Sequence, residues 1–156
     1  MHATRRWREK LEKEQEYKIV DIPPKMEKRL GKGKMLIPRP LDVDALIRKV
    51  KKGKLVTQEQ IRERLAKEFK VDVVCPITTG IFVRIAAEAA EEDLRRGEKR
   101  VTPYWRVVKA NGYLNEKFPG GVAGQATRLR EEGHSILLGK NKKPLVKDYE
   151  KYLQKL

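Results

Sequence analysis

Few side chains in this chain of 156 residues are of the types that carry out covalent or metal chemistry. Cys75, the single cysteine, lies beside Pro76 in the apolar run 71–77, a setting typical of a buried and inert thiol. His2 and His134 have no partners at the spacing of metal ligands, so we expect no metal site and no cofactor. A lone cysteine also excludes an intrachain disulfide and favours a reducing, intracellular setting.

Basic side chains are more informative, because the net charge of +15 is concentrated at the two ends of the chain. Residues 1–54 hold 17 Lys and Arg against 8 Asp and Glu, residues 139–156 hold 6 against 2, and residues 55–138 hold 14 against 12. Such flanks usually bind a polyanion, and we favour nucleic acid over a merely solubilising charge. The candidate phosphate contacts are Lys49, Lys51, Lys52, Lys54, Lys140, Lys142 and Lys143.

Composition also excludes some classes of protein. No run of about 18 apolar residues is present, which argues against a membrane-spanning helix. Residues 1–16 lack the apolar segment of a secretory signal, and few large apolar residues accompany the basic ones, which disfavours a membrane surface. We therefore expect a monomer in the cytoplasm, associated with the nucleoid.

Two successive helices are expected to position the groups that bind. Thr57 has the pattern of an N-cap, and Gln60 completes a capping box for a helix over 57–69. Its apolar face holds Ile61, Leu65 and Phe69.

The second helix is predicted over 79–96, capped by Thr78 or Thr79 and ended at Gly97, after Pro76 stops the preceding apolar run. The two helices together suggest a helix-turn-helix variant with a long turn. The apolar positions of the second helix are Ile81, Phe82, Ile85, Ala86, Ala89 and Leu94.

Short strands and turns are predicted after the helix pair. Asn111-Gly112 between apolar runs indicates a hairpin, which would make the domain a winged helix. A further helix is expected over 122–132 with Gly133 at its C-terminal cap, and a last strand over 134–138.

The segments before residue 55 are expected to differ in kind. Residues 1–20 predict a charged helix with Trp7, Leu11 and Tyr17 along one side, and the Pro- and Gly-rich residues 21–40 predict a linker or extended wrap without a helix. Helical periodicity restarts over 42–51, with Asp42 or Asp44 as the cap and Val43, Leu46, Ile47 and Val50 as the apolar face. We expect a basic extension and linker over 1–40, a DNA-binding domain over 41–138 and a basic tail over 139–156.

Residues 101–136 hold four short motifs in a fixed order: Pro103-Tyr104-Trp105-Arg106-Val107, Gly112, Gly120-Gly121, and Leu129-Arg130-Glu131-Glu132-Gly133. This order resembles the C-terminal DNA-binding domain of O6-alkylguanine-DNA alkyltransferases, in which Pro-Cys-His-Arg-Val precedes a Gly turn, a Gly-Gly pair and a helix ending in Glu-Gly. Upstream, Gly53-Lys54-Leu55-Val56-Thr57 resembles the family's entry to its first helix, and Val83-Arg84-Ile85-Ala86-Ala87-Glu88-Ala89 resembles its recognition helix. The resemblance covers residues 41–138. It implies an α+β, mainly helical domain of winged-helix or helix-turn-helix type.

The departures from the family's motifs decide the chemistry. The acceptor cysteine falls on Tyr104 and the activating histidine on Trp105, and a phenol beside an indole cannot supply the thiolate that alkyl transfer needs. Glu132 matches the family's glutamate but has no histidine to orient, so we interpret it as a surface carboxylate at a helix end. The pattern is nearest to the alkyltransferase-like proteins, which lack the cysteine, bind alkylated DNA and flag it for other repair proteins.

The resemblance implies a set of site residues. Arg84 would enter the DNA beside the small residue Ala87 and fill the space of a flipped base, the alternative being an ion pair with Glu88. Tyr104 would line a lesion pocket or act as ordinary core. The other expected DNA contacts are Thr57, Gln58, Thr79, Arg106, Lys52 and Lys54, and the pocket also includes Trp105, Gly120 and Gly121. For Arg106 the favoured alternative is a structural role, and for Thr57 and Gln58 the alternative is plain capping of the helix.

The sequence therefore predicts a non-catalytic protein that binds duplex DNA, with alkylated or flipped guanine as its candidate lesion in DNA repair. Three alternatives remain open: an RNA-binding or ribosome-associated basic module, a cysteine-dependent alkyltransferase that uses Cys75, and a structural adaptor with a vestigial groove.

Overall fold

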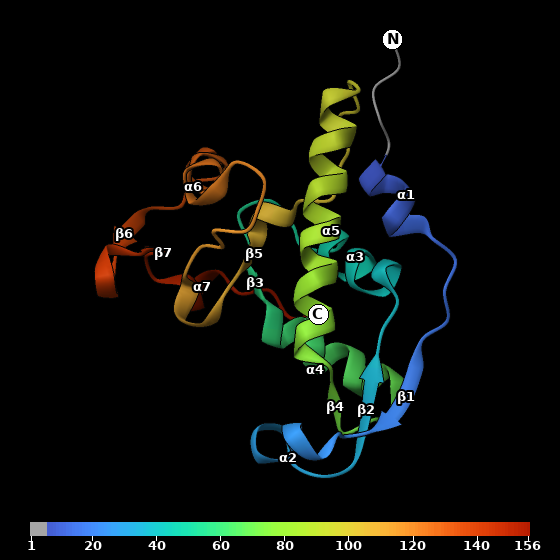
Figure 1. The fold of residues 1–156 in the computed structure, drawn as a ribbon. Helices are drawn as coiled ribbons and strands as arrows, with labels where there is room; N and C mark the ends of the chain where they lie inside the picture. Colours follow the sequence, from blue (N-terminus) through green and yellow to red (C-terminus); the bar gives the residue numbers. More distant parts are fainter. Residues whose placement is uncertain (1–5) are drawn as a thin grey trace.

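A helix of 20 residues, α5 (Pro76–Arg95), forms the axis of the molecule in the computed structural model, which describes residues 6–156 (Figure 1). The fold is a mixed α+β arrangement, as expected. The remaining elements are α1 (Arg6–Glu12), β1 (Lys18–Asp21), α2 (Pro24–Leu30), β2 (Lys34–Ile37), α3 (Pro40–Arg48), β3 (Val56–Thr57), α4 (Gln58–Phe69), β4 (Val73–Val74), β5 (Val107–Val108), α6 (Gly121–Glu131), β6 (Ile136–Leu138), β7 (Pro144–Val146) and α7 (Tyr149–Tyr152).

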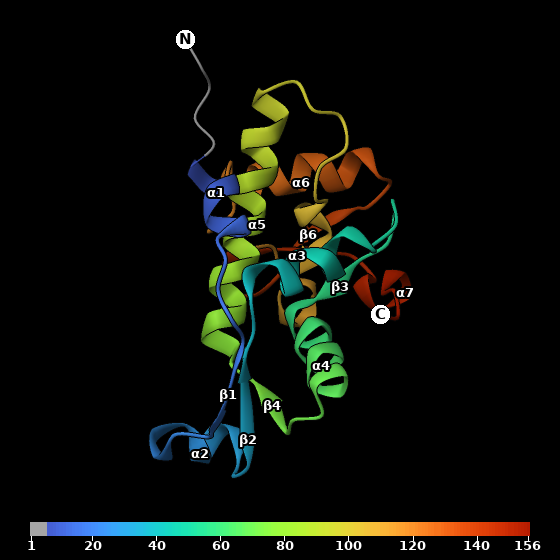
Figure 2. The same ribbon diagram turned by 90° about the vertical axis from the view of Figure 1, so that its right-hand side faces the viewer.

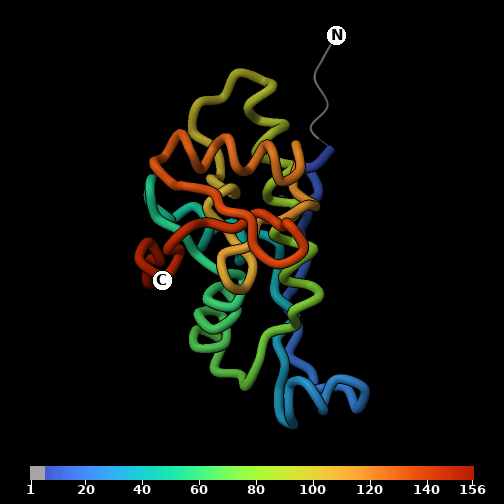
Figure 3. The backbone as a smooth tube through the Cα atoms, turned by 90° about the vertical axis from the view of Figure 1, so that its left-hand side faces the viewer, coloured from blue at the N-terminus to red at the C-terminus, as the bar shows by residue number. Residues whose placement is uncertain are grey.

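Helices lie around α5 at different levels and on different sides. The α1 helix packs on one side of its C-terminal half, α6 lies on the other side, and α4 lies toward its N-terminal end (Figures 1 and 2). The α2 helix and the β1–β2 hairpin sit at the end of the molecule farthest from α6 (Figure 3). The main core gathers apolar side chains of α1, α3, α4 and α5, including Leu11, Ile47, Leu65 and Val83.

Within the described residues the strands form three small sheets in place of the predicted wing. The β2 strand pairs antiparallel with β1 and parallel with β4, β3 pairs parallel with β5, and β6 pairs antiparallel with β7. The hairpin predicted at Asn111-Gly112 is wrong: these residues form a tight turn, but β5 before it pairs with β3, and Tyr113 after it bridges to Leu145. The α+β class is confirmed, whereas a winged helix is not.

Local capping chemistry explains where the helices begin. The capping box of α4 is confirmed, since the Gln60 backbone N–H donates to the Thr57 hydroxyl at 3.1 Å and the Thr57 backbone N–H donates to Gln60 Oε1 at 2.9 Å. The caps predicted for the other two helices are wrong. Both α3 and α5 begin at a proline, Pro40 and Pro76, because proline's fixed φ and missing N–H suit the first position of a helix.

The N-terminal flank is more structured than expected. The first helix ends at Glu12, well before residue 20, and the segment 21–40 contains α2 and β2, so the prediction that it has no helix is wrong. Proline again starts a helix here, at Pro24. Residues 1–5, which include His2 and the start of the predicted helix, lie outside the described residues.

The C-terminal flank is also folded. The strand predicted over 134–138 is confirmed as β6, but it is not the last, because β7 and α7 follow within residues 139–156. Val146 is fully buried, and Leu153 bridges to Leu55 at the start of the central region. The predicted helices over 57–69 and 122–132 are confirmed within one or two residues, as is the end of α5 at Gly97.

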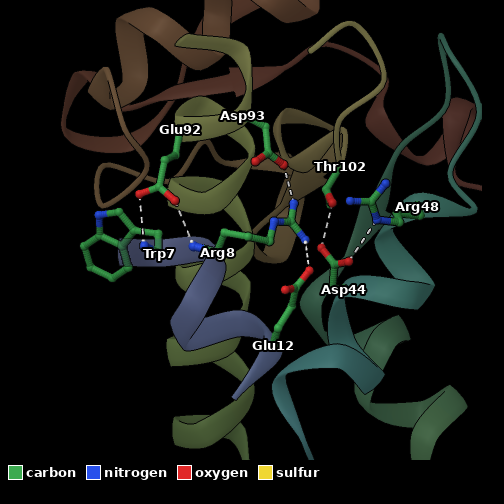
Figure 4. Close-up of polar contacts among 8 residues, drawn as sticks. All are labelled: Trp7, Arg8, Glu12, Asp44, Arg48, Glu92, Asp93 and Thr102. Carbon is green, nitrogen blue, oxygen red and sulfur yellow. Dashed lines mark hydrogen bonds and ion pairs between the residues drawn. The ribbon is translucent and has the colours of Figure 1, made fainter. Parts of the chain in front are cut away.

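A buried polar network fastens α1 to α5 (Figure 4). The Glu92 carboxylate accepts hydrogen bonds from the backbone N–H groups of Trp7 and Arg8 at 3.0 Å each, which provides partners for two N–H groups in the first turn of α1. The Arg8 guanidinium pairs with Asp93 and Glu12. Nearby, buried Asp44 of α3 accepts from the Thr102 hydroxyl and from Arg48.

Candidate nucleic-acid interface

A groove of about 430 Å³ lies between the N-terminal half of α5, the start of α4 and the loop 115–117. The loop is held in place by the buried Gln125 of α6, whose side chain accepts from the Asn115 backbone N–H at 2.8 Å and donates to two backbone carbonyls. The groove is lined by Gln58, Pro76, Ile77, Gly80, Ile81, Arg84, Lys109, Asn115, Glu116 and Lys117.

Arg84 is exposed in this groove, as the sequence predicted for a DNA-contacting side chain. It makes no hydrogen bond or ion pair with any of residues 6–156, so the alternative pairing with Glu88 is not formed. Lys109 and Lys117 line the same groove, and Lys109 pairs at 3.4 Å with Glu116, the one acid among the described lining residues. Arg84 is therefore available to an anionic ligand.

Two adjoining hollows extend the basic surface, and both share Lys109 with the groove. The smaller, of about 230 Å³, is lined by Thr57, Gln58 and Arg62 at the start of α4. The larger, of about 680 Å³, is bordered by the loop between β6 and β7, which contributes Lys140, Lys142 and Lys143. This basic face comprises Arg62, Arg84, Lys109, Lys117, Lys140, Lys142 and Lys143, against the acids Glu59 and Glu116.

The other lysines predicted to contact phosphate lie elsewhere. Lys52 and Lys54 are exposed on the turn around Gly53, outside the three hollows. Lys49 and Lys51 are on the same stretch, where their backbone groups bond the side chain of Gln154.

Tyr104 occupies the position that the resemblance gives to the acceptor cysteine. Its side chain is only 1% exposed, its ring packs against Phe118, and its hydroxyl donates to the Glu91 carboxylate at 2.5 Å. Burial and the hydrogen bond to Glu91 raise the pKa of the Tyr104 phenol well above its usual value. This phenol is a neutral packing group in the structure.

A shallow hollow of about 500 Å³ opens over Tyr104, between α5 and α6. Gly120 lines it, whereas Trp105 and Gly121 do not. Arg128 reaches across the hollow, pairs with Glu91 at 2.6 Å and places its guanidinium 4.8 Å above the Trp105 ring.

The interpretation of Glu132 as a surface carboxylate is wrong. Its carboxylate is nearly buried and accepts hydrogen bonds from the indole N–H of Trp105 at 2.9 Å, from the Arg106 guanidinium at 2.8–3.2 Å and from the Gly53 backbone N–H at 3.1 Å. Burial alone would raise the pKa of Glu132, but these hydrogen bonds outweigh it and lower the pKa below its usual value. Glu132 therefore ties the turn at Gly53 to the segment after Tyr104.

Several residues predicted to contact DNA have internal partners instead. Arg106 is directed inward, where it bonds Glu132 and the Val50 carbonyl. Thr79 is fully buried and donates its hydroxyl to the Cys75 carbonyl at 2.8 Å, and Ala87 is fully buried in the core. These two side chains cannot reach a ligand without unpacking α5. Thr57 is half-buried in its capping box.

Cys75 is buried, as the sequence predicted, and accepts a hydrogen bond at Sγ from the Thr78 hydroxyl at 3.3 Å. Among residues 6–156, no three His, Cys, Asp or Glu side chains are grouped as metal ligands. Within the same residues no helix is long and apolar enough to cross a membrane.

Three residues of the basic face were not predicted from the sequence: Arg62, Lys109 and Lys117. Ile81, one of the apolar positions predicted for this helix, is 53% exposed in the groove beside Ile77. A signal was present, because Ile77, Ile81 and Arg84 follow one another at i, i+4 and i+7 and so share one stripe of α5.

Neither a protein-family model nor a curated protein sequence matches the chain. Among solved structures it is similar to Atl1 of S. pombe, whose crystal structure is a complex with damaged DNA that contains O6-carboxymethylguanine. The two chains are 18% identical, the alignment covers 75% of this chain and 94% of that one, and the TM-score is 0.49.

Proposed function

We propose that this protein binds duplex DNA through the basic face and does so without transferring an alkyl group. The observation that carries this proposal is Arg84, an exposed arginine on α5 that has no partner among residues 6–156 and lies in a groove with Lys109, Lys117 and one acid, Glu116. Cations gathered over adjoining hollows suit phosphates that follow one another along a nucleic-acid backbone. The sequence motifs that resemble alkyltransferase-like proteins favour duplex DNA as that nucleic acid.

The absence of alkyl transfer follows from the side chain at the acceptor position. Transfer needs an accessible thiolate with a neighbouring base. Tyr104 is a buried phenol hydrogen-bonded to a carboxylate, and Cys75 is buried at the start of α5. These features support the proposal that the protein acts by binding, and we propose that it marks the DNA for other repair proteins.

The hollow over Tyr104 is the proposed place for a flipped or alkylated guanine. Arg84, which lines the groove, and Glu91, which lines this hollow, lie seven residues apart on the same stripe of α5, so the two openings are about two helical turns apart along the helix. A base in this hollow would contact Tyr104 and would lie within reach of Arg128. The guanidinium of Arg128 already lies over the ring of Trp105. Gly120 and Gly124, which carry no side chain, line the hollow at the start of α6.

A titration of the full-length protein against matched duplexes tests the proposal. Fluorescence anisotropy with a plain duplex, the same duplex carrying one O6-methylguanine, and a structured RNA hairpin should give the tightest binding for the modified duplex. Stronger binding to the RNA hairpin than to either duplex would overturn duplex DNA as the ligand. Equal affinity for the two duplexes would contradict the proposal that the hollow over Tyr104 binds a modified base, but it would leave the proposed DNA binding intact.

The non-catalytic part of the proposal has its own test. After incubation with DNA that contains O6-methylguanine, the intact mass of the protein should be unchanged. A gain of one methylene mass that disappears in Cys75→Ser would show that the buried thiol is an acceptor.

A further inference from the structure

Two isoleucines of α5 are exposed in a groove whose other lining residues, apart from Pro76 and Gly80, are polar or charged. Ile77 is 62% exposed and Ile81 is 53% exposed. They lie one turn apart, with Arg84 on the next turn of the same stripe. A single exposed apolar residue needs no explanation, but a pair inside a concave, cationic surface indicates a contact with a ligand that is both anionic and apolar.

The charges around the pair select one kind of occupant. Arg84, Lys109 and Lys117 border the same groove, opposed by Glu116. A second protein surface would need matched acids around an apolar centre, whereas duplex DNA combines a phosphate backbone with apolar base and sugar faces. The pair of isoleucines therefore fits a nucleic-acid duplex better than a protein.

We propose that Ile81 is an apolar wedge that enters a base step beside the nucleotide contacted by Arg84, while Ile77 packs on the neighbouring sugars. This inference rests on the proposed binding of duplex DNA and specifies how that binding deforms the duplex. Apolar side chains inserted between base pairs partly unstack the step and kink the duplex.

Geometry on the helix supports this assignment. At about 1.5 Å of rise per residue, the stretch from Ile77 to Arg84 spans roughly 10 Å, which corresponds to about three base steps. The branched side chain of isoleucine has one strongly preferred rotamer in a helix, so it loses little freedom on insertion. Opening a step next to Arg84 would lower the barrier to turning a base out of the stack toward the hollow over Tyr104.

Fluorescence of 2-aminopurine, an adenine analogue quenched by stacking, tests the wedge in the full-length protein. The probe is a DNA duplex that carries one 2-aminopurine. Its fluorescence intensity reports unstacking, and the anisotropy of a labelled duplex, measured in parallel, reports binding. The wild type should raise the fluorescence at saturation, Ile81→Met should keep the rise, and Ile77→Ala/Ile81→Ala should lose most of it while binding about tenfold more weakly. Alanine favours helix at exposed positions, so the variant should fold.

Ile19→Ala is the matched control, because Ile19 is 46% exposed on β1 and lies outside the groove. It should behave as the wild type in both measurements. A wild type that binds the duplex without raising fluorescence, or a double variant that raises it fully, would overturn the wedge but leave DNA binding intact. A wild type that does not bind duplex would overturn the proposed function itself. A dimer that becomes monomeric in the double variant, seen by sedimentation, would assign the patch to a second copy of the chain and overturn the wedge.

Discussion

Charged side chains are paired and buried on one side of α5, whereas on the other side an arginine is exposed without a partner among residues 6–156. On the side that faces α1, Glu92 and Asp93 are buried and bonded to the backbone of α1 and to Arg8 (Figure 4). On the groove side, Arg84 is exposed and has no partner among residues 6–156, and the apolar side chains of Ile77 and Ile81 are exposed beside it.

This difference separates what holds the helix from what the helix presents. Buried charges are retained in a fold only when partners compensate them, since an unpaired ion in the interior is strongly destabilising. An exposed arginine is solvated and adds little to stability, so its pairing can be left to a ligand. Changes on the first side should therefore alter folding, and changes on the second should alter binding.

The largest expected effect is that of Arg8→Met. Removing the guanidinium leaves Asp93 buried without its cation, which should lower the free energy of unfolding by about 3 kcal/mol. Urea denaturation at neutral pH, followed by circular dichroism, measures this loss. Arg84→Met is the matched control and should change the unfolding free energy by less than about 0.5 kcal/mol. Equal losses in the two variants would contradict the division between the sides.

The Glu132 carboxylate is also nearly buried and hydrogen-bonded to several partners, so a substitution there should lower stability, as on the α1 side. Glu132→Gln weakens the charged hydrogen bonds from Arg106 and Trp105 and should lower the free energy of unfolding by about 2 kcal/mol at neutral pH. Because the folded-state pKa of Glu132 is lowered, the stabilisation from its charge is fully present above the usual value of about 4.5 and is lost as the pH falls below it.

The difference in stability between wild type and Glu132→Gln should therefore shrink on acidification, as measured by urea denaturation at neutral pH and at about pH 3.5. A difference that stays constant across this range would show that the loss comes from packing and not from the ionised carboxylate.

On the groove side, Arg84→Ala should weaken binding to duplex DNA about tenfold and leave the unfolding free energy nearly unchanged. Anisotropy at fixed salt measures the affinity. Arg64→Ala provides the control, because Arg64 is a partly exposed arginine of α4 that pairs with Glu68 and lines none of the three hollows. Equal affinity of Arg84→Ala and Arg64→Ala for the duplex would contradict the proposal that α5 contacts DNA.

Tyr104 lies where the two sides meet, since its hydroxyl bonds Glu91 inside the fold while its edge lines the hollow. Tyr104→Phe removes the hydrogen bond to Glu91 and should lower the free energy of unfolding by about 1 kcal/mol. The loss stays small because Glu91 keeps Arg128 as a partner. Thermal and urea denaturation check the stability, and the affinity for an unmodified duplex should not change. A large loss of affinity for that duplex would place Tyr104 in the general contact surface.

The smallest effect is expected for one lysine at the rim. Lys142→Gln should lower the slope of log affinity against log salt by about 0.9, the value for one lost phosphate contact. The measurement is a series of titrations at increasing salt. Lys28→Gln on α2, at the far end of the molecule, should leave the slope unchanged (Figure 1). Identical slopes for both variants would exclude the β6–β7 loop from the interface.

Much of the local structure could be predicted because it depends on neighbours in the sequence. The capping box at Thr57 involves residues three positions apart, and the apolar period over residues 57–69 places Ile61 and Leu65 in the core. Proline-rich stretches were misread, since Pro24, Pro40 and Pro76 each start a helix instead of interrupting one. The same residue type fits a linker or a first helical turn, and the sequence nearby does not choose between them.

By itself the sequence determined the mixed α+β class, the burial of Cys75, the exposure of Arg84 and the excess of positive charge at both flanks. Tertiary structure alone decided which charges are matched and which apolar faces are covered. Arg8 meets Asp93 across 85 residues of chain, and Glu132 meets Gly53 across 79. Helical periodicity marks the faces of α5, but a face becomes core only when distant segments pack against it. Segments that include α1 and α3 cover one side of α5 and leave Ile77, Ile81 and Arg84 exposed on the other.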